Sequence, residues 1–479
     1  MRTGIKIDSK WWAYGVVLTG TFMGGLNTYI VNVSLPAIAT ALEADIAVVQ
    51  WVLLAYLLAI TSSLVIFGRA SDLWGSRRVF TAGLLTFVLG SALAGAAPTA
   101  WSLVAFRGIQ GLGSAMMTAS GQALLAEVFP EDQRGRALAS MHVAVALGFA
   151  TGASMGGLLV EALGWRWVFF ANLPAGILAA LAAAWQLPEV RRARERGSDP
   201  AGTALLVVGL VLTLLGLTEV QQSDFRIGSA MLVAGVAVLA AFALVEYRAP
   251  HPVLDLRLFR HLGFTAGLLA AFFNFIAMAS NMFLIPFFLQ LQLGMNPVRA
   301  GLVMMAVPLA ILWSAPIGGW CSDRLGPRMP ATAGLTLVTA TVFLMALLGG
   351  NASALAMALV LTIYGVGAGL FQSPNNSGVL GSAPRERLGT ASGTLATMRQ
   401  LGQVAGIALA STVWVLREQG YLAAGAVEIT AQGAGFRDAF LVLGIAGVLA
   451  IAASAVRGGK LTMAGRQAVS SDAVVASKE

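Results

Sequence analysis

Two arginines lie inside long apolar stretches, and they are the first candidates for functional residues in this chain. Arg107 stands between the uncharged runs 79–106 and 108–126, and Arg399 is flanked by apolar and amide residues. A guanidinium in hydrocarbon is costly unless it is paired or faces water. Each arginine therefore lines a wet pathway or bonds to nearby carbonyls and amides. Gln110, one turn after Arg107, is such a partner.

Acidic residues are absent from the interior of the apolar runs. The 22 Asp and Glu residues all fall in or beside the loops between runs. A site within an apolar run that binds a cation or carries a proton generally needs an acid, so a neutral or anionic ligand fits this chain better than a dication. The nearest titratable group within a run is His142, in 137–160. It is either a proton carrier or a hydrogen-bonded spacer.

Amide side chains at membrane depth form a second set of candidates. Each must hydrogen-bond internally or line a wet cavity, so these residues either surround a substrate or join helices to one another. A methionine beside them would add an adaptable apolar wall. The candidates for a substrate cavity are Asn27, Asn32, Asn274, Asn281, Met278, Gln372 and Asn375.

The composition places these groups in a membrane protein. Of 479 residues, 57% are hydrophobic and 11% are charged, with a mean hydropathy of +0.79. A soluble chain carries about 25% charged residues, so the composition excludes a soluble enzyme or a disordered chain. It also argues against nucleic-acid binding despite a net charge of +8. One cysteine and three histidines leave little material for a metal or cofactor, and no Walker-type nucleotide loop is present for an ATP-driven pump.

Uncharged runs of about 20 residues predict fourteen transmembrane helices. Eleven runs are long enough to cross once, among them 167–188 and 300–322. The run 329–384 is too long for one crossing and is expected to turn at Gly349-Gly350-Asn351. The segment 388–416 supplies the last span. The expected fold class is an all-α integral membrane protein.

The distribution of basic residues predicts the orientation. With the N-terminus inside, 23 of the 30 Lys and Arg residues lie on the cytoplasmic side and five on the other, while two lie within spans. Cytoplasmic loops are enriched in Lys and Arg. We therefore expect both termini in the cytoplasm, without a cleaved signal peptide.

Two loops of the chain repeat one pattern of glycine, acid and arginine. The string "FGRASDLWGSRR" at 67–78 matches "IGGWCSDRLGPR" at 317–328 at a distance of 251 residues. Further glycines match at a distance of 254, such as Gly111 with Gly365 and Gly148 with Gly402. The repeat unit is therefore six helices, and spans seven and eight remain as an inserted pair. Parallel repeats of this kind are the layout of transporters with a site between the halves.

The repeat divides the chain into four parts. Residues 1–190 form an N-terminal six-helix bundle and 191–250 form the inserted helix pair. Residues 251–456 form a C-terminal six-helix bundle, and 457–479 form a cytoplasmic tail.

Several strings of the chain are those of one transporter family. The pattern G-x-x-x-D-x-x-G-x-R-R after span two, the pattern R-x-x-Q-G at 107–111, and the strings "LNTYIVNVSLP" at 26–36 and "WRWVFFANLP" at 165–174 occur in order. On these residues the chain resembles the major facilitator superfamily, in its fourteen-helix drug–proton antiporter branch. The resemblance covers nearly the whole chain.

The resemblance implies three roles. A conformational latch that stabilises the outward-facing state would comprise Gly68, Asp72, Gly75, Arg77, Arg78, Asp323 and Arg328. Coupling of proton and substrate movement would involve Arg107, Gln110, His142 and Arg399. A hinge surface on span five, where glycines four residues apart let helices touch, would comprise Gly148, Gly152, Gly156 and Gly157.

Two departures from the branch pattern bear on mechanism. Asn27 stands where the branch usually has an aspartate in span one, and Ala153 stands where the span-five motif has a proline. An amide does not titrate, so Asn27 cannot carry a proton. A helix without the proline should be straighter.

We expect a secondary active exporter of small amphipathic compounds that works by alternating access with a proton as counter-ion. The alternatives are a dedicated exporter of a lipid or of a neutral or anionic metabolite, with weak or no proton coupling, and a non-transporting membrane sensor or assembly factor. The expected partners are a small-molecule substrate and the lipid bilayer. We expect a monomer without a cofactor, in the bacterial cytoplasmic (inner) membrane.

Overall fold

The computed structural model describes residues 7–187, 200–221, 225–249, 259–382 and 388–456, and all the regular structure in these ranges is helical. Eleven helices have the length and apolar composition of membrane spans. Three further helical stretches do not meet this combination of length and apolar composition: a shorter apolar stretch, Ala204–Val220, and the long helices α4 (Ala100–Val128) and α15 (Leu388–Ala423), which carry Arg107 and Arg399. The all-α membrane fold is thus confirmed, and the fourteen predicted spans are consistent with these helices.

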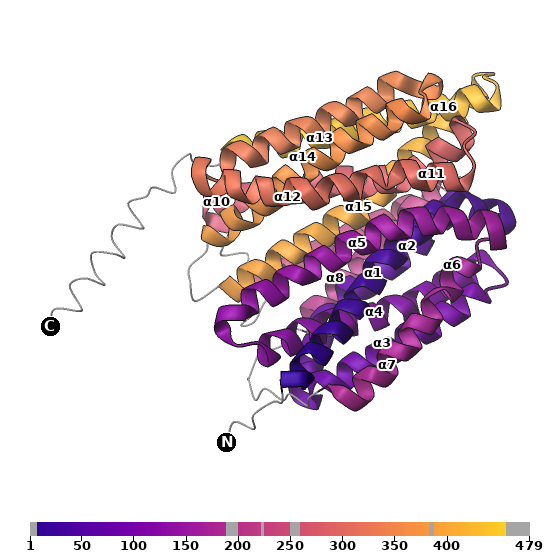
Figure 1. Cartoon of the computed structure of the whole chain (residues 1–479). Coiled ribbons are helices and arrows are strands. Elements are labelled where there is room, and N and C mark those ends of the chain that lie inside the picture. Colours follow the sequence, from indigo (N-terminus) through magenta and orange to yellow (C-terminus); the bar gives the residue numbers. More distant parts are fainter. Residues whose placement is uncertain (1–6, 188–199, 222–224, 250–258, 383–387, 457–479) are drawn as a thin grey trace.

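The first bundle holds the helices that precede the inserted pair (Figure 1). They are α1 (Ile7–Ala41), α2 (Ile46–Trp74), α3 (Ser76–Gly95), α4 (Ala100–Val128), α5 (Glu131–Leu163), α6 (Trp167–Phe170) and α7 (Asn172–Gln186). The single span predicted at 167–188 is thus divided into α6 and α7. Pro174 has no N–H for the preceding turn, and the Asn172 side chain bonds back to the Val168 carbonyl at 3.3 Å.

The second bundle follows the inserted pair. It holds α10 (Leu262–Phe287) with a π-helical turn η2 (Phe288–Gln292), α11 (Pro297–Met304), α12 (Ala306–Leu325), α13 (Arg328–Leu348), α14 (Ala354–Gly381), α15 (Leu388–Ala423) and α16 (Glu428–Val456). The predicted span 300–322 starts earlier, where Asn296 caps α11, and it breaks at Met305 ahead of Pro308. The turn predicted at Gly349–Asn351 is present, with Gly349 at a φ of 53°.

The inserted pair consists of α8 (Pro200–Gln221) and α9 (Phe225–Arg248), which pack on each other. Helix α8 also touches α2 and α15, one from each bundle. The contact with α2 includes a hydrogen bond of 2.9 Å from the Trp51 indole to the Thr218 hydroxyl. Most of α9 is uncovered by protein.

Glycines place the same helix contacts in both bundles. A Cβ on Gly152 would lie 2.5 Å from the Leu26 carbonyl oxygen, so α5 touches the backbone of α1. A Cβ on Gly406 would lie 2.4 Å from the Ile276 carbonyl oxygen, so α15 touches α10 in the same way. Such distances allow no side chain. Helices α3 and α4 pair as α13 and α14 do, a match between the two parts of the chain that the repeat in the sequence relates.

The boundary between the bundles is formed by α5 against α11 and α12, by α2 against α15, and by α1 against α10. In Figure 1, α5 and α15 run along this boundary. A Cβ on Gly301 would lie 2.3 Å from the Ala153 carbonyl oxygen, and a Cβ on Gly157 would lie 2.2 Å from that of Pro297. The Gln290 amide adds a hydrogen bond of 2.9 Å to the Val33 carbonyl. One end of the boundary is therefore tightly closed.

Candidate functional site

A buried polar network in the first bundle surrounds Arg107. This side chain is 0% exposed. Its Nε donates to the Val52 carbonyl at 2.9 Å, its Nη1 donates to Gln110 Oε1, and its guanidinium carbon lies 4.2 Å from the centre of the Tyr56 ring. Helices α2 and α4 thus hold Arg107 through a carbonyl, an amide and an aromatic face. No described carboxylate pairs with it.

The network continues through Gln110 to α1 and α3. The Gln110 amide donates to Asn27 Oδ1 at 3.0 Å and to Ser91 Oγ at 2.9 Å. Asn27 is also 0% exposed. Two donors of the network have no hydrogen-bond partner among the described residues, Arg107 Nη2 and Asn27 Nδ2. Asn172, which donates to Ser91 at 3.4 Å, adds one acceptor that no described residue satisfies, Asn172 Oδ1. Within the described residues the network therefore has a positive charge, two unpaired donors and one unpaired neutral acceptor.

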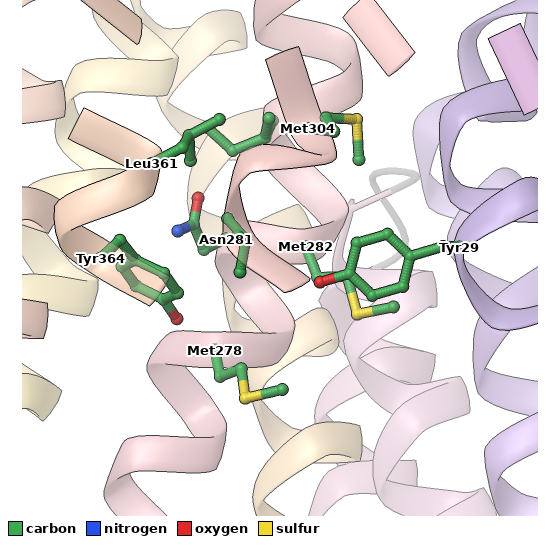
Figure 2. Close-up of a pocket in the computed structure, with 9 residues that line it drawn as sticks. Tyr29, Met278, Asn281, Met282, Met304, Leu361 and Tyr364 are labelled. Atoms are coloured by element: carbon green, nitrogen blue, oxygen red, sulfur yellow. The ribbon is translucent and has the colours of Figure 1, made fainter. Parts of the chain in front are cut away.

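A pocket opens in the second bundle, where it faces α1 (Figure 2). Tyr29 reaches it from α1, with its hydroxyl directed across the boundary, and Asn281 and Tyr364 supply the other polar groups. The remaining wall is apolar. The lining residues are Tyr29, Met278, Asn281, Met282, Ile285, Met304, Val307, Leu361 and Tyr364.

The pocket and the Arg107 network occupy equivalent places in the two bundles. Gly111 faces the Tyr56 carbonyl, and Gly365 faces the Val307 carbonyl in the same way. This contact pairs α4 with α14 at a shift of 254 residues and α2 with α12 at a shift of 251.

At these shifts, three residues of the network have counterparts that line the pocket. Leu361 and Tyr364 stand where Arg107 and Gln110 stand in the first bundle, and Val307 stands where Tyr56 does. The same position of the repeat therefore holds a charged, hydrogen-bonded pair in the first bundle and a largely apolar pocket wall in the second.

The predicted amide candidates are distributed over several places. Asn281 and Met278 line the pocket, and Gln372 contacts the Met278 sulfur at 4.0 Å. Asn32 and Asn274 are buried, and neither amide has a hydrogen-bond partner among the described residues.

Two more predicted site residues lie in the second bundle, where α14 meets α15. Asn375 is buried in α14. Arg399 of α15 donates from Nη2 to Asn376 Oδ1, and its guanidinium carbon lies 5.6 Å from the centre of the Phe275 ring. Arg399 is thus separate from the Arg107 network.

The two repeated loops turn at matched glycines. Gly75 between α2 and α3 has a φ of 96°, and Gly326 between α12 and α13 has a φ of 80°, a region that favours glycine. Arg77 donates to the Ala184 carbonyl of α7. A Cβ on Gly68 would have no neighbour within 4 Å.

The other loop candidates lie at the surface or outside the described part. Arg78, Asp323 and Arg328 have exposed side chains. The side chains of Asp72 and His142 lie outside the described residues.

The hinge glycines divide between two contacts. Gly148, Gly152 and Gly156 face α1 within the first bundle, whereas Gly157 faces Pro297 of the second bundle. Ala153, which stands in place of the branch proline, directs its carbonyl at Gly301. The stripe thus joins an internal contact to the boundary contact.

Two polar residues of the pocket are not among the site residues predicted from the sequence. Tyr29 and Tyr364 are tyrosines within predicted spans, and a hydroxyl at membrane depth is the signal that could have found them. The matched glycines at 111 and 365 would also have aligned Tyr364 with Gln110.

Comparisons with known proteins agree with this architecture. The sequence model described as "Major Facilitator Superfamily" matches residues 17–407. The riboflavin transporter of Clostridioides difficile is 31% identical over 407 residues, covering 85% of this chain and 88% of that protein. The tetracenomycin C resistance and export protein of Streptomyces glaucescens is 31% identical, covering 84% of this chain and 75% of that protein.

A solved structure shares the fold. It is a bacterial homologue of the human lysosomal transporter Spinster, in an inward-facing and unoccupied conformation, with a TM-score of 0.69 at 15% identity and coverage of 95% of this chain and 98% of that one. The helices, the repeat and the matched residues lead to one conclusion: this chain is a membrane transporter that belongs to the Major Facilitator Superfamily.

Proposed function

We propose that this transporter exports small amphipathic compounds by alternating access, driven by a proton gradient. The observation that carries the proposal is the pocket at the bundle boundary. Its wall of methionine, leucine, isoleucine and valine suits apolar bodies of varied shape. Its two tyrosines and one amide suit a small number of polar groups on the ligand.

Closure of one end of the boundary supports the alternating-access part of the proposal. Besides the glycine contacts, Glu161 of α5 accepts a hydrogen bond of 3.2 Å from the Asn296 amide. With the orientation predicted from the basic residues, this end faces outward. The conformation is then closed to the outside, and the latch and hinge residues named above would govern its exchange with the opposite state.

The remaining parts of the proposal concern setting and coupling. We place the protein in a bacterial inner membrane as a monomer with both termini in the cytoplasm. Residues 1–190 and 251–456 would move as bundles, with 191–250 as a peripheral pair. Arg107, Gln110, His142 and Arg399 are the proposed coupling residues, and Asn32, Asn274, Gln372 and Asn375 would line the cavity in other states of the cycle.

A second candidate function is the dedicated export of a neutral or anionic metabolite with weak proton coupling. The absence of a described carboxylate beside Arg107 favours it, since no group there would bind a cation. The similarity to a protein named as a riboflavin transporter also supports a dedicated substrate.

Efflux in inverted membrane vesicles tests both candidates. Amphipathic compounds matched in size but neutral, anionic or cationic would be screened with and without an imposed pH gradient. Accumulation of several classes that depends on the gradient supports the first candidate. Accumulation of one class without such dependence supports the second. If vesicles with the protein accumulate no more of any compound than vesicles without it, the result would count against export.

A further inference from the structure

Two donors in the Arg107 network require an acceptor that the described residues do not supply. Arg107 Nη2 and Asn27 Nδ2 are buried and have no hydrogen-bond partner there. Buried polar atoms in folded proteins are nearly always paired, and an orphan points to a water or an ion. Both orphans here are donors, and one belongs to a cation.

The rest of the network does not balance the charge of Arg107. Its one unpaired acceptor among the described residues, Asn172 Oδ1, belongs to a neutral amide that donates to Ser91. Gln110 Oε1 already accepts from Arg107, and the Gln110 amide already donates to Asn27 and Ser91. The Tyr56 hydroxyl donates to Ser114 at 3.0 Å, and the Tyr56 ring faces the guanidinium. These contacts fix the positions of the two orphan donors, but they leave the charge of Arg107 uncompensated.

We infer that Arg107 and Asn27 bind a monovalent anionic group, either a halide ion or the carboxylate of the transported compound. A water molecule would satisfy the donors and leave the charge. An anion would satisfy both, because charge-assisted hydrogen bonds from a guanidinium are strong and an uncompensated buried charge is costly. Anion binding requires the asparagine at position 27, because its amide donates a hydrogen bond, whereas an aspartate carboxylate there would repel an anion.

Thermal unfolding of the purified protein in lipid nanodiscs tests the site without any need for transport. Sodium chloride and sodium bromide would be titrated against sodium sulfate at constant ionic strength. A ligand that binds the folded state raises Tm as its concentration passes Kd. We expect a saturable rise of Tm in chloride and bromide. Equal Tm values in halide and sulfate would overturn the halide source.

Variants of the two binding residues make the assignment specific. Asn27→Asp places a carboxylate in the network, so this variant should be more stable than wild type in sulfate and should lose the halide effect. Arg107→Gln removes the charge and should also lose the halide effect, but without the gain in sulfate. Thr339→Asp, which also places a carboxylate at a buried site but on α13, should keep the halide effect. An unchanged halide effect in Asn27→Asp would place the ion elsewhere.

A transport arm distinguishes the two sources and rests on the proposed function. Inverted vesicles would be given 1-naphthoate and its uncharged amide at equal concentration. If the substrate supplies the anion, we expect uptake of the carboxylate to exceed that of the amide about tenfold in wild type and to fall to parity in Asn27→Asp, since one such charge contact is worth about 1.4 kcal/mol. If a halide supplies it, the stability arm is positive and both probes are taken up alike. Failure of the proposed function would abolish uptake of both probes and leave the stability result intact. No halide effect together with equal uptake of the two probes would overturn the inference.

Discussion

The Arg107 network and the pocket of the second bundle lie at equivalent places in the repeat, and their chemistries are opposite. In the first bundle the position holds an arginine and a glutamine that are bonded to α1, α2 and α3. In the second bundle it holds Leu361 and Tyr364, which border the pocket. The same helix contacts support both.

The difference shows how two repeated bundles can acquire different roles in ligand recognition at the same position. A network whose groups bond to one another fixes four helices and leaves two donors, Arg107 Nη2 and Asn27 Nδ2, for a small charged group rather than space for an apolar body. Replacement of the arginine by leucine and of the glutamine by tyrosine removes those bonds and leaves space between α10, α12 and α14. We therefore assign charge recognition to the first bundle and recognition of an apolar body to the second.

The largest effect is expected from placing the chemistry of the first bundle in the second. Leu361→Arg buries a guanidinium in a pocket whose lining residues include no carboxylate to balance its charge. The cost should be about 3 kcal/mol or more, and little folded protein should reach the membrane. Membrane yield and Tm measure it, with Leu361→Met as the matched control. A normal yield would mean that the pocket is wet enough to hold a charge.

The next effect concerns the boundary that both sites share. Gly301→Ala places a methyl group against the Ala153 carbonyl. The two bundles should therefore no longer make close contact at this end of their boundary. We expect normal yield with loss of most vesicle efflux. Gly15→Ala is the control, because a Cβ there has open space. Wild-type efflux in Gly301→Ala would show that this contact is not required by the cycle.

A smaller effect is expected within the pocket. Tyr364→Phe removes one hydroxyl and keeps the ring, so a ligand bonded to it should lose about 1 kcal/mol. We expect the half-saturation concentration for efflux to rise about fivefold, with the maximal rate nearly unchanged. Tyr247→Phe, on the exposed surface of α9, should change neither. The same small effect in both variants would remove Tyr364 from the binding site.

The smallest effect is expected where the inserted pair meets the first bundle. Thr218→Val removes the partner of the Trp51 indole, which should cost about 1 kcal/mol of stability. Tm should fall by a few degrees while efflux per folded molecule stays constant. A large loss of efflux would give α8 a part in the cycle that the account does not assign to it.

The sequence alone predicted the helices and the repeat because both follow from local patterns. Spans follow from apolar length, and the match of Gly111 with Gly365 is visible in the strings themselves. The breaks at Ala171 and Met305 were not predicted, because a proline near the start of an apolar run does not tell whether the helix bends or ends.

The pocket was harder to predict because it depends on how each helix is rotated. Asn27 and Asn281 are both amides within apolar spans, but one is bonded to Gln110 and the other faces the pocket. Tyr29 and Tyr364 come together only when α1 packs against α10. Such long-range contacts leave no mark in local composition.

In the proposed mechanism, a transported compound binds in the pocket. The most direct test is whether such a compound protects a cysteine in the pocket from labelling. Cys321 of α12 is the only cysteine, so Met278→Cys in a Cys321→Ser background gives one reporter in the pocket. Maleimide labelling would be measured with and without a compound that wild-type vesicles accumulate, and Cys321 of the wild type serves as the reporter outside the pocket. We expect the compound to slow labelling of Met278→Cys at the concentrations that saturate efflux and to leave labelling of Cys321 unchanged. Labelling of Met278→Cys that is unchanged by a saturating compound would contradict binding in the pocket.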